Sequence, residues 1–551
     1  MDDFGPHKYG AELEINPPIE GRQLPNIVAV DVETDERDNF VGMGVCGSPK
    51  HVMYFSKLVD ISGKKILTCG GKADIRWLKN WGIKVSYDDI YCDVSVLDYS
   101  INSYGKHGLK NMAKRYLEYE WPTYEEMVGK GKKKITLDKQ PINRVARYCG
   151  MDALAAYNLY ECMWQKKVPH QSKKYYLEVE FPFYKAVAEM EERGAMVNIS
   201  GIKELDYILE KELVDLESTA IEKAGMNLNV RSPQQVMNAC KHLKIKCKST
   251  GAEALKEHSD HEFVKALLNY REAFKLRSAF TAPLLKRPDI PRIRTTFNTT
   301  RTITGRISSK NPNLQQIPSR TERGVHLRNC FIPKEGSKLV VADYSQIELR
   351  VFAHLSAEPL LLNAYRNDED IHDKVAATIG SNRNVAKTFG FGSLYGAGPK
   401  RLAVTADIPE NEARKLLDAY WGNMPAASAW VTRMKWDAYR RGGVRTIFNR
   451  FIPIHDIKSS NIREKKAAER KVVNYTIQGS AAEIIKIAMI RLRENGVVPI
   501  LQVHDELVFE VLEERAEEVS QRVKEHMEQA VTLSVPLKVN VKICNRWGEM
   551  K

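Results

Sequence analysis

Residues 501–510 read LQVHDELVFE and form an apolar run with three ionisable side chains at its centre. Leucine, valine and phenylalanine residues flank His504, Asp505 and Glu506 on both sides. A hairpin whose turn carries the polar residues explains this pattern without any chemistry. A metal site at the same turn explains it equally well, because a carboxylate at the edge of a sheet can face a cleft. The rest of the chain has to separate these two interpretations.

A second apolar strand also ends in an acid. Residues 338–345 read KLVVADYS, so Asp343 directly follows a predicted strand. Asp343 and Asp505 are far apart in the sequence, but neighbouring strands would bring them together. Two such carboxylates can hold two Mg²⁺ ions about 3.5–4 Å apart, which activates one oxygen and stabilises the leaving one. Taken singly, each acid is equally well explained as an ordinary strand-end aspartate.

A further set of acids lies near the N-terminus. In VAVDVETD, Asp31 and Glu33 are two residues apart on a predicted strand, so their side chains point the same way. In RYCGMDAL, Tyr148 and Asp152 are four residues apart on a predicted helix and share a face. Asp74 lies between these segments in the sequence. The ordered set predicts a site that binds two divalent ions, Mg²⁺ or Mn²⁺, and orients a water molecule.

Residues 381–398, SNRNVAKTFGFGSLYGAG, predict a helix with a stripe of cationic and aromatic side chains along one face. Arg383, Lys387, Phe391 and Tyr395 recur at every fourth residue, which gives a slightly winding row along one face. Two cations followed by two aromatic rings suit a triphosphate followed by a base. An amphipathic helix with a basic tip is the alternative. Gly390, Gly392 and Gly396 argue against a helix kept only for packing.

Composition favours a basic intracellular protein. The chain has 551 residues, and its 84 Lys and Arg against 70 Asp and Glu give a formal net charge of +14. Such an excess favours a polyanionic partner such as nucleic acid. The nine cysteines form no C-x-x-C pair, so neither a zinc site nor a disulfide framework is predicted. The scattered cysteines favour a reducing, cytoplasmic location. No run of about eighteen apolar residues occurs, so we expect no membrane partner.

Hydrophobic periodicity divides the chain into regions. Residues 26–100 show α/β patterns, 175–288 and 346–440 are helical, and strands return from residue 497. The order is therefore α/β, helical, then a β core interrupted by a helical insertion.

These motifs, in this order, resemble the A family of DNA polymerases over nearly the whole chain. VADYSQIELR and QVHDELVFE are similar to the two palm motifs of that family, and RNVAKTFGFGSLYG to its fingers motif. TITGRISSKNPNLQQIP and AAERKVVNYTIQGSAAEIIK are similar to stretches that grip primer and template. The front third resembles the DEDD-type 3′→5′ proofreading exonuclease. The resemblance implies a ribonuclease H-like α/β exonuclease domain followed by a right-hand polymerase, with an α+β palm and a helical thumb and fingers.

The resemblance also implies domain boundaries and an activity. The domains would be the exonuclease (1–170), thumb (175–290), first palm part (291–355), fingers (356–455) and second palm part (456–551). We expect no 5′-nuclease domain, since nothing in the sequence precedes the exonuclease. The implied activity is template-directed DNA synthesis with 3′→5′ proofreading, in replication or repair. The implied partners are primer–template DNA, dNTPs and replication accessory proteins, and we expect a monomer.

At the polymerase site, the resemblance assigns binding of two Mg²⁺ ions to Asp343, the backbone carbonyl of Tyr344, and Asp505. Glu506 is then a secondary acid. Lys387 would hold the triphosphate and act as general acid for the pyrophosphate leaving group.

The resemblance assigns the nucleotide to a further set of side chains. Arg383 and His372 would contact phosphates, although the segment between them is shorter than in the bacterial enzymes. Phe391 and Tyr395 would pack near the sugar and the templating base. Glu348 would stand against the ribose 2′-hydroxyl.

The resemblance implies DNA contacts, mostly in the minor groove and on the sugar-phosphate backbone, at Arg306, Asn313, Gln315, Arg470, Asn474, Gln478 and His504. Two positions depart from the family pattern. Gly70 stands where an Asn usually lies four residues before the exonuclease Asp74. Because Asp74 itself is intact, we expect editing to survive, with the effect of Gly70 on its rate left open. Gln316 replaces a usual Asn beside the primer.

Two other function classes share features with this sequence. A single-subunit RNA polymerase shares the palm and the Arg/Lys…Tyr-Gly helix, but the nuclease region and Glu348 count against it. A DNA-binding scaffold with decayed catalysis is the other class, and the intact carboxylate sets count against it, because clustered carboxylates are costly to keep.

Overall fold

The computed structural model describes residues 4–18, 23–131, 134–287 and 289–550. The chain forms two compact units. The first unit consists of Met1–Glu192, Thr299–Ile307 and Val431–Glu494. The second unit consists of Arg193–Asn298, Ser308–Trp430 and Asn495–Lys551. Among the helices of the described residues, none combines the length and apolar character needed to cross a membrane.

A six-stranded mixed sheet forms the core of the first unit. Its strands are β1 (Glu12–Ile15), β2 (Ile27–Thr34), β3 (Phe40–Ser48), β4 (His51–Phe55), β5 (Lys65–Thr68) and β6 (Ile90–Asp93). The strand order is β1-β4-β3-β2-β5-β6. β2 and β3 are antiparallel, whereas β2, β5 and β6 run parallel. The predicted α/β architecture of the N-terminal region is confirmed, and β2 is a central strand whose first half is wholly apolar, as burial on both faces requires.

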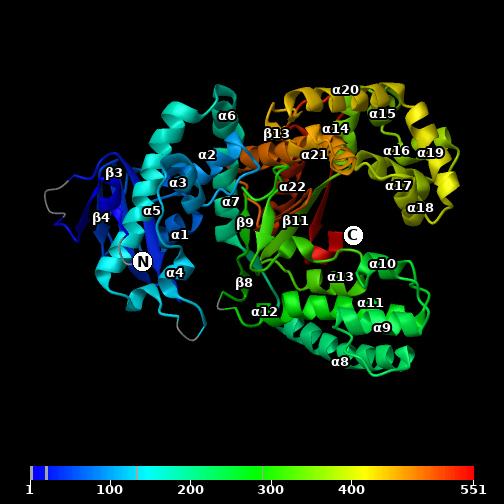
Figure 1. Cartoon of the computed structure of the whole chain (residues 1–551), viewed down its shortest axis with the longest axis horizontal. Helices are drawn as coiled ribbons and strands as arrows, with labels where there is room; N and C mark the ends of the chain where they lie inside the picture. Colours follow the sequence, from blue (N-terminus) through cyan, green and yellow to red (C-terminus); the bar gives the residue numbers. More distant parts are fainter. Residues whose placement is uncertain (1–3, 19–22, 132–133, 288, 551) are drawn as a thin grey trace. The chain divides into compact units, whose positions relative to one another are not determined.

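The first unit also contains helices. They are α1 (Lys72–Asn80), α2 (Val94–Ile101), α3 (Leu109–Leu117), α4 (Tyr124–Val128), α5 (Ile142–Cys162), α6 (His170–Tyr175) and α7 (Phe181–Arg193). The long helix α5 packs directly on the sheet (Figure 1). At Gly44 of β3 an added Cβ would lie 2.7 Å from the carbonyl oxygen of Cys149 on α5. Only glycine allows α5 to approach β3 so closely.

The same unit contains later parts of the chain. These are the C-terminal part of α20 (Pro425–Arg441), β12 (Gly443–Arg445), β13 (Phe451–Pro453) and α21 (Ile462–Glu494). Two buried ion pairs lie here: Arg450 Nε is 3.2 Å from Glu483 Oε1, and Lys486 Nζ is 2.6 Å from Glu180 Oε1. Arg450 also donates to the carbonyl oxygen of Thr304 at 2.6 Å. The buried Arg450 guanidinium therefore links the loop that carries Thr304 to Glu483 on α21.

Asp98 on α2 is a buried carboxylate with three donors around it. Its side chain is 1% exposed and lies 2.6 Å from Nδ1 of His107 and 2.7 Å from the Tyr116 hydroxyl, and Arg115 also pairs with it. Burial by itself would raise the pKa of Asp98, but these hydrogen bonds and charges lower it below the ordinary value. The ionised form of Asp98 therefore stabilises the first unit.

The second unit combines helices with a small sheet. Its first helices and short strands are β7 (Ala195–Met196), α8 (Ile199–Ala224), α9 (Pro233–His242), α10 (Ala252–Lys256), α11 (Glu262–Leu276), α12 (Ala282–Leu284), β8 (Arg292–Ile293), β9 (Thr296–Asn298), β10 (Ser308–Lys310) and α13 (Glu322–Asn329). The later helices are α14 (Ile347–Ser356), α15 (Pro359–Arg366), α16 (Ile371–Ile379), α17 (Arg383–Leu394), α18 (Pro399–Ala406), α19 (Glu410–Gly422) and α22 (Ala516–Glu528).

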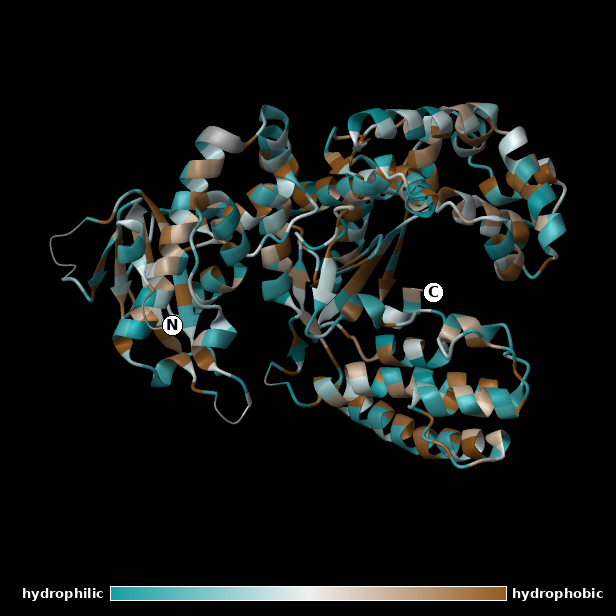
Figure 2. Cartoon of the chain, in the orientation of Figure 1, coloured by the Kyte–Doolittle hydropathy of each residue, from teal (hydrophilic) through white to brown (hydrophobic). Residues whose placement is uncertain are grey.

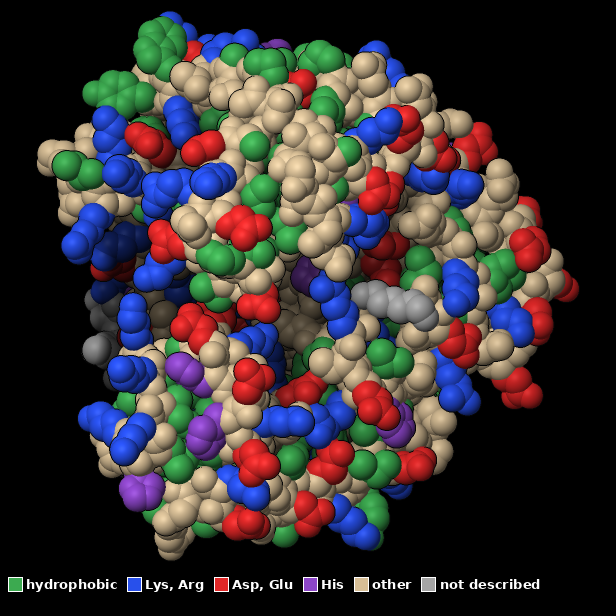
Figure 3. All heavy atoms as spheres, turned by 90° about the vertical axis from the view of Figure 1, so that its right-hand side faces the viewer, with side chains coloured by type: hydrophobic (Ala, Val, Ile, Leu, Met, Phe, Trp, Pro, Cys, Tyr) green, Lys and Arg blue, Asp and Glu red, His purple; other side chains and the backbone are tan. Residues whose placement is uncertain are grey.

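A four-stranded antiparallel sheet forms the centre of the second unit. Its strands are β11 (Ser337–Tyr344), β14 (Leu501–Val503), β15 (Glu506–Leu512) and β16 (Val539–Cys544), in the order β14-β15-β11-β16. Figure 2 shows apolar residues along these strands, whereas helices such as α8 and α11 alternate apolar and hydrophilic residues. The predicted β core with a helical insertion is confirmed. Figure 3 shows Lys and Arg interspersed with Asp and Glu on the face that it displays.

Candidate active sites

The first unit brings the N-terminal acids together. Asp31 and Glu33 lie on β2, Asp74 lies in the first turn of α1, and Tyr148 and Asp152 lie on α5. The negative charge of Asp152 acts on both Asp31 and Glu33, and that of Asp74 acts on them as well. The carboxylates that the strand and helix spacings single out therefore lie together in one cluster.

Burial and mutual repulsion control the protonation of this cluster. Burial raises the pKa of Asp31 and Glu33 well above the ordinary range, and the charge of Asp152 adds to the effect. Burial and then the charge of Asp93 raise the pKa of Asp74 to about 7. Among the described residues, the buried Oδ2 of Asp31 has no hydrogen-bond partner. Buried oxygen donors with an unsatisfied carboxylate suit hard divalent cations such as Mg²⁺ or Mn²⁺, so the residues present fit the predicted metals.

A thiol also lies in this cluster. Ligand atoms of Asp31, Glu33 and Cys149 all lie within 4.8 Å of one another. Burial raises the pKa of the Cys149 thiol, and its Sγ donates to the backbone carbonyl of Asp31. A protonated thiol is a poor ligand for a hard cation, so the carboxylates remain the candidate ligands.

The turn before α1 explains the departure at Gly70. Gly70 has φ +74°, in the left-handed region, where Asn is the best tolerated alternative to glycine. Its N–H donates to Oδ2 of Asp93 at 2.6 Å, and the hydroxyl of Thr68 donates to the same oxygen at 2.9 Å. The backbone that leads into Asp74 is thus held without an Asn side chain. The effect on nuclease rate stays a prediction.

Two residues of this site are not predicted from the sequence. Lys110 Nζ lies 3.0 Å from Oδ1 of Asp152, and Trp121 Nε1 donates to the same oxygen at 2.7 Å. No spacing rule points to either residue, since both come from segments that only the fold brings against α5.

The second unit contains the predicted hairpin. β14 ends at Val503 and β15 begins at Glu506, so His504 and Asp505 form the two-residue turn, and His504 has φ +58°. Asp343 pairs in register with Glu506. The N–H of Tyr344 donates to the carbonyl oxygen of Asp505 at 3.3 Å. Both interpretations of the segment 501–510 therefore fit its geometry: it is a hairpin, and its turn lies beside the end of β11.

Glu506 is buried with partners that the sequence does not predict. Its Oε1 accepts from Trp547 Nε1 at 2.7 Å and lies 3.6 Å from NH1 of Arg328. The Arg328 guanidinium lies 4.1 Å from the centroid of the Trp547 ring. These contacts hold the carboxylate next to Asp343 in a defined orientation.

Glu348 and Tyr395 meet in the structure. The Tyr395 hydroxyl donates to Oε2 of Glu348, which is 7% exposed on α14. Both residues are predicted to lie at the nucleotide, but their contact with each other is not foreseen from the sequence. The bond fixes the bulk of the Glu348 carboxylate near the start of α14.

His372 is a buried residue of the same unit. It is 3% exposed, its Nε2 lies 3.4 Å from Nε2 of Gln346, and its ring centroid lies 5.9 Å from that of Phe391. Burial lowers the pKa of His372, so the neutral ring is favoured near neutral pH. The two predicted nucleotide residues His372 and Phe391 are thus neighbours. A phosphate contact by His372 stays a prediction.

The predicted helix over 381–398 is wrong in its last turn. α17 ends at Leu394, Tyr395 caps it, and Gly396 follows with φ +68°. The packing argument about glycine is also wrong at Gly392, where an added Cβ would lie 2.4 Å from a methyl carbon of Leu402 on α18. A larger residue at this position would force the Leu402 side chain to move.

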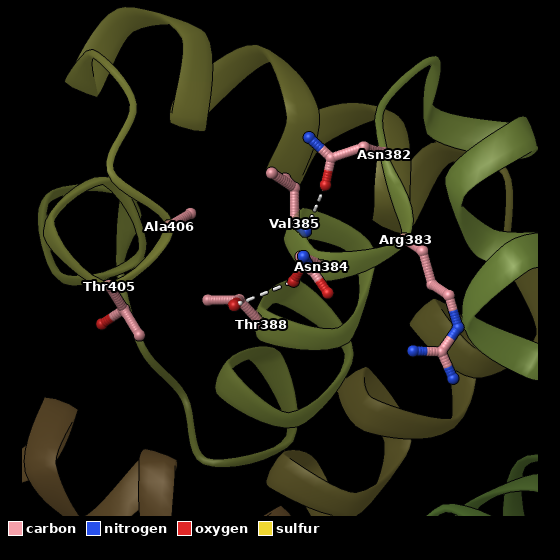
Figure 4. A pocket seen from close by; sticks show the side chains of 7 residues that line it. All are labelled: Asn382, Arg383, Asn384, Val385, Thr388, Thr405 and Ala406. Carbon is pink, nitrogen blue, oxygen red and sulfur yellow. Dashed lines mark hydrogen bonds between the residues drawn. The ribbon is translucent and has the colours of Figure 1, made fainter.

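Arg383 and Lys387 have different surroundings on α17. Lys387 is exposed, whereas Arg383 donates to Oδ2 of Asp370 at 2.7 Å. A pocket beside the start of α17 is drawn in Figure 4, where the Arg383 side chain points away from Thr405 and Ala406. A phosphate that bound Arg383 would therefore compete with Asp370.

The predicted DNA contacts fall in both units. In the second unit, Gln315 Nε2 donates to the carbonyl of Gln502 at 3.3 Å, and Gln502 Nε2 donates to that of His504 at 2.9 Å. Asn313 lies at the start of the turn that carries Gln315.

The first unit contains the remaining predicted DNA contacts. Arg470, Asn474 and Gln478 are four residues apart on α21, so they form one row on its surface, and Arg306 lies in the loop fastened by Arg450.

Comparisons with known proteins show which family the chain resembles. A family model described as DNA polymerase family A matches residues 200–549, and one described as 3′-5′ exonuclease matches residues 48–167. The chain is similar to DNA polymerase I of Pseudomonas aeruginosa, with 35% identity over 87% of this chain and 56% of that protein. It is similar to DNA polymerase I of Borreliella burgdorferi, with 31% identity over 98% of this chain and 64% of that protein.

A solved structure matches the fold over almost the whole chain. It is described as the POL domain of Pol1 from M. smegmatis in complex with DNA primer-template and dNTP, with a TM-score of 0.85 and 28% identity. The match covers 98% of this chain and 99% of that chain. The chain spans between about half and two thirds of the length of the curated relatives described above.

Proposed function

Because the chain belongs to DNA polymerase family A, we propose that it extends primers on a DNA template from dNTPs and proofreads with a 3′→5′ exonuclease. The observation that carries the proposal is the hydrogen bond from Tyr344 N–H to the Asp505 carbonyl, which joins the end of β11, where Asp343 lies, to the hairpin turn. Such an arrangement suits a site for two Mg²⁺ ions, which would stabilise the attacking and leaving oxygens of an in-line phosphoryl transfer.

In the polymerase reaction, we assign a separate role to each side chain. Asp343, Asp505 and the Tyr344 carbonyl would hold the metal ions, and Glu506 would support them as a secondary acid. Lys387 binds the triphosphate and gives a proton to the leaving pyrophosphate. Its exposure on α17 leaves it accessible to a nucleotide.

The nucleotide is bound by residues around α14, α16 and α17. Arg383 exchanges Asp370 for a phosphate oxygen, and His372 lies beside Phe391, against which the sugar packs. Glu348 excludes a 2′-hydroxyl, held in place by Tyr395.

In the nuclease reaction, Asp31, Glu33, Asp74 and Asp152 would hold two divalent ions, and Tyr148 would orient the attacking water. The buried carboxylates and their raised pKa values support this assignment, because a divalent cation would relieve both the repulsion and the unsatisfied oxygen.

We divide the hand as the resemblance implies, with the exonuclease at 1–170, thumb at 175–290, palm at 291–355 and 456–551, and fingers at 356–455. Primer–template DNA and dNTPs are the proposed ligands, by analogy with the similar structure, which is described as a complex with both. DNA contacts are proposed at Arg306, Asn313, Gln315, Arg470, Asn474, Gln478 and His504.

We also propose a monomer in the cytoplasm that works with replication accessory proteins. All nine cysteines are free thiols, which supports a reducing environment.

Primer extension tests this function. The full chain should extend a 5′-labelled primer with dNTPs only when Mg²⁺ is present, and Asp343→Asn should abolish extension. With rNTPs in place of dNTPs, extension should be far slower. Efficient rNTP use would favour the RNA polymerase class, and absence of any synthesis would favour a DNA-binding scaffold.

A further inference from the structure

Lys110 lies inside the proposed nuclease site. It is the second residue of α3, and its Nζ is 3.0 Å from Oδ1 of Asp152 and 3.4 Å from the Tyr148 hydroxyl. The same ammonium group lies 4.6 Å from the ring centroid of Trp121 and 4.4 Å from that of Tyr148. With a side chain only 23% exposed, Lys110 is held between two aromatic rings and touches both predicted catalytic residues of α5.

Trp121 completes the arrangement around the carboxylate. Its Nε1 donates to Oδ1 of Asp152 at 2.7 Å, so this one oxygen has two donors. A metal ion that approaches Asp152 therefore meets a carboxylate whose rotation is already restricted. Groups that orient a metal ligand in this way typically change metal affinity or activity by about 10- to 100-fold when they are mutated.

The positive charge of Lys110 lies beside a proposed metal ligand, because its Nζ is 3.0 Å from Oδ1 of Asp152. A cation this close to a ligand oxygen repels a second cation that binds the same carboxylate. Lys110 therefore orients Asp152 and, at the same time, opposes metal binding there.

We propose that Lys110 is a positioning residue of the nuclease site that orients Asp152 and Tyr148 and sets the divalent metal concentration at which the nuclease works. The proposal rests on the proposed nuclease function. It predicts an unusual pair of effects in Lys110→Met: metal binding becomes tighter because a positive charge is gone, and the maximal nuclease rate falls because the two catalytic side chains lose their common donor. A salt bridge with a merely structural role would give weaker metal binding, because the ligands would become disordered.

Direct metal binding separates these two roles. In the full chain carrying Asp343→Ala, which removes a ligand of the other metal site, Mn²⁺ binding is measured from the electron paramagnetic resonance signal of the free ion. Lys110→Met should lower the Mn²⁺ dissociation constant about tenfold, whereas Lys110→Arg keeps the charge and should stay within about threefold of the parent. Lys114→Met is the matched control, because Lys114 lies on the same helix, is 72% exposed and pairs with Glu120.

Nuclease kinetics complete the test. On single-stranded DNA at saturating Mn²⁺, Lys110→Met should lower the maximal rate about 10- to 100-fold. Unchanged or weaker Mn²⁺ binding in Lys110→Met would overturn the proposal, as would an unchanged maximal rate. Circular dichroism checks that Lys110→Met folds. If it does not fold, the folded Lys110→Arg variant takes its place, and weaker Mn²⁺ binding in that variant would overturn the proposal. A parent chain that binds Mn²⁺ but degrades no DNA would refute the nuclease function separately.

Discussion

Sugar discrimination at the polymerase site should depend on the bulk of Glu348. Glu348 follows Asp343 by five residues, is 7% exposed at the start of α14 and accepts a hydrogen bond from Tyr395. Glu348→Ala removes Cγ and the carboxylate group, with which a ribose 2′-hydroxyl would otherwise clash. The variant should therefore use ribonucleotides much better relative to deoxyribonucleotides.

The size of the effect follows from two terms. A buried hydroxyl without a partner costs about 1–3 kcal/mol, and forcing extra atoms into a packed site costs about 1–3 kcal/mol. If Glu348→Ala removes most of both energy costs, discrimination between ribonucleotides and deoxyribonucleotides should fall by about 2–4 kcal/mol, or roughly 30- to 900-fold at 1.36 kcal/mol per decade. Because Tyr395 loses its acceptor, dNTP incorporation should also slow, by about fivefold for a hydrogen bond of about 1 kcal/mol.

The assay is the ratio of kcat/KM for each dNTP and its matching rNTP on one primer–template. It uses the Asp31→Ala, Glu33→Ala background, because editing would erase misincorporated ends. Glu348→Gln is the matched control, since it keeps the volume and loses only the charge, and it should discriminate nearly as well as the parent. An unchanged ratio in Glu348→Ala would refute the steric argument, and equal relaxation in Glu348→Gln would assign discrimination to charge instead of bulk.

Three further predictions concern separate parts of the chain. Asp31→Ala with Glu33→Ala should abolish 3′→5′ degradation of labelled DNA and spare primer extension, whereas Asp343→Asn should do the reverse; a double variant that cannot extend would contradict separate sites. Phe391→Tyr adds a hydroxyl whose hydrogen bond is worth about 1–3 kcal/mol, so it should raise dideoxynucleotide use by about one to two decades. The measurement is competition between dideoxynucleotides and deoxynucleotides in nuclease-deficient protein. No gain would mean that Phe391 is not at the sugar. Asp98→Asn should lower the free energy of unfolding by about 1–3 kcal/mol at pH 7, measured by denaturant titration, because it removes the charge of a buried carboxylate that accepts several hydrogen bonds. Since the pKa of Asp98 is lowered, this contribution is full above about pH 4 and is lost as pH falls through the folded value; a deficit that grows as pH falls below about 4 would contradict it.

Local periodicity is enough to predict both carboxylate sets. Asp31 and Glu33 share a face because side chains alternate along a strand, and Tyr148 and Asp152 share a face because four residues make about one helical turn. The hairpin around Asp505 is equally visible, because a polar pair between two apolar runs is a turn signal. The order of α/β, helical and β regions follows from the same patterns.

Short-range patterns are less reliable where helix packing intervenes. The spacing of the stripe on α17 predicts a helix through residue 398, but the helix ends at Leu394. Gly392 taken alone argues against packing, yet its missing side chain makes room for Leu402. Spacing along a helix reports which residues share a face, but it does not report what covers that face.

Only the tertiary structure reveals the partners that orient these acids. Lys110 and Trp121 reach Asp152 from segments 42 and 31 residues away, and Arg328 and Trp547 reach Glu506 from 178 and 41 residues away. The sequence by itself determined which carboxylates lie on the edges and faces of local elements, because that depends on backbone periodicity alone. Which cation or indole contacts each carboxylate depends on how distant elements pack, and a single sequence does not show which carboxylate a given lysine or tryptophan contacts.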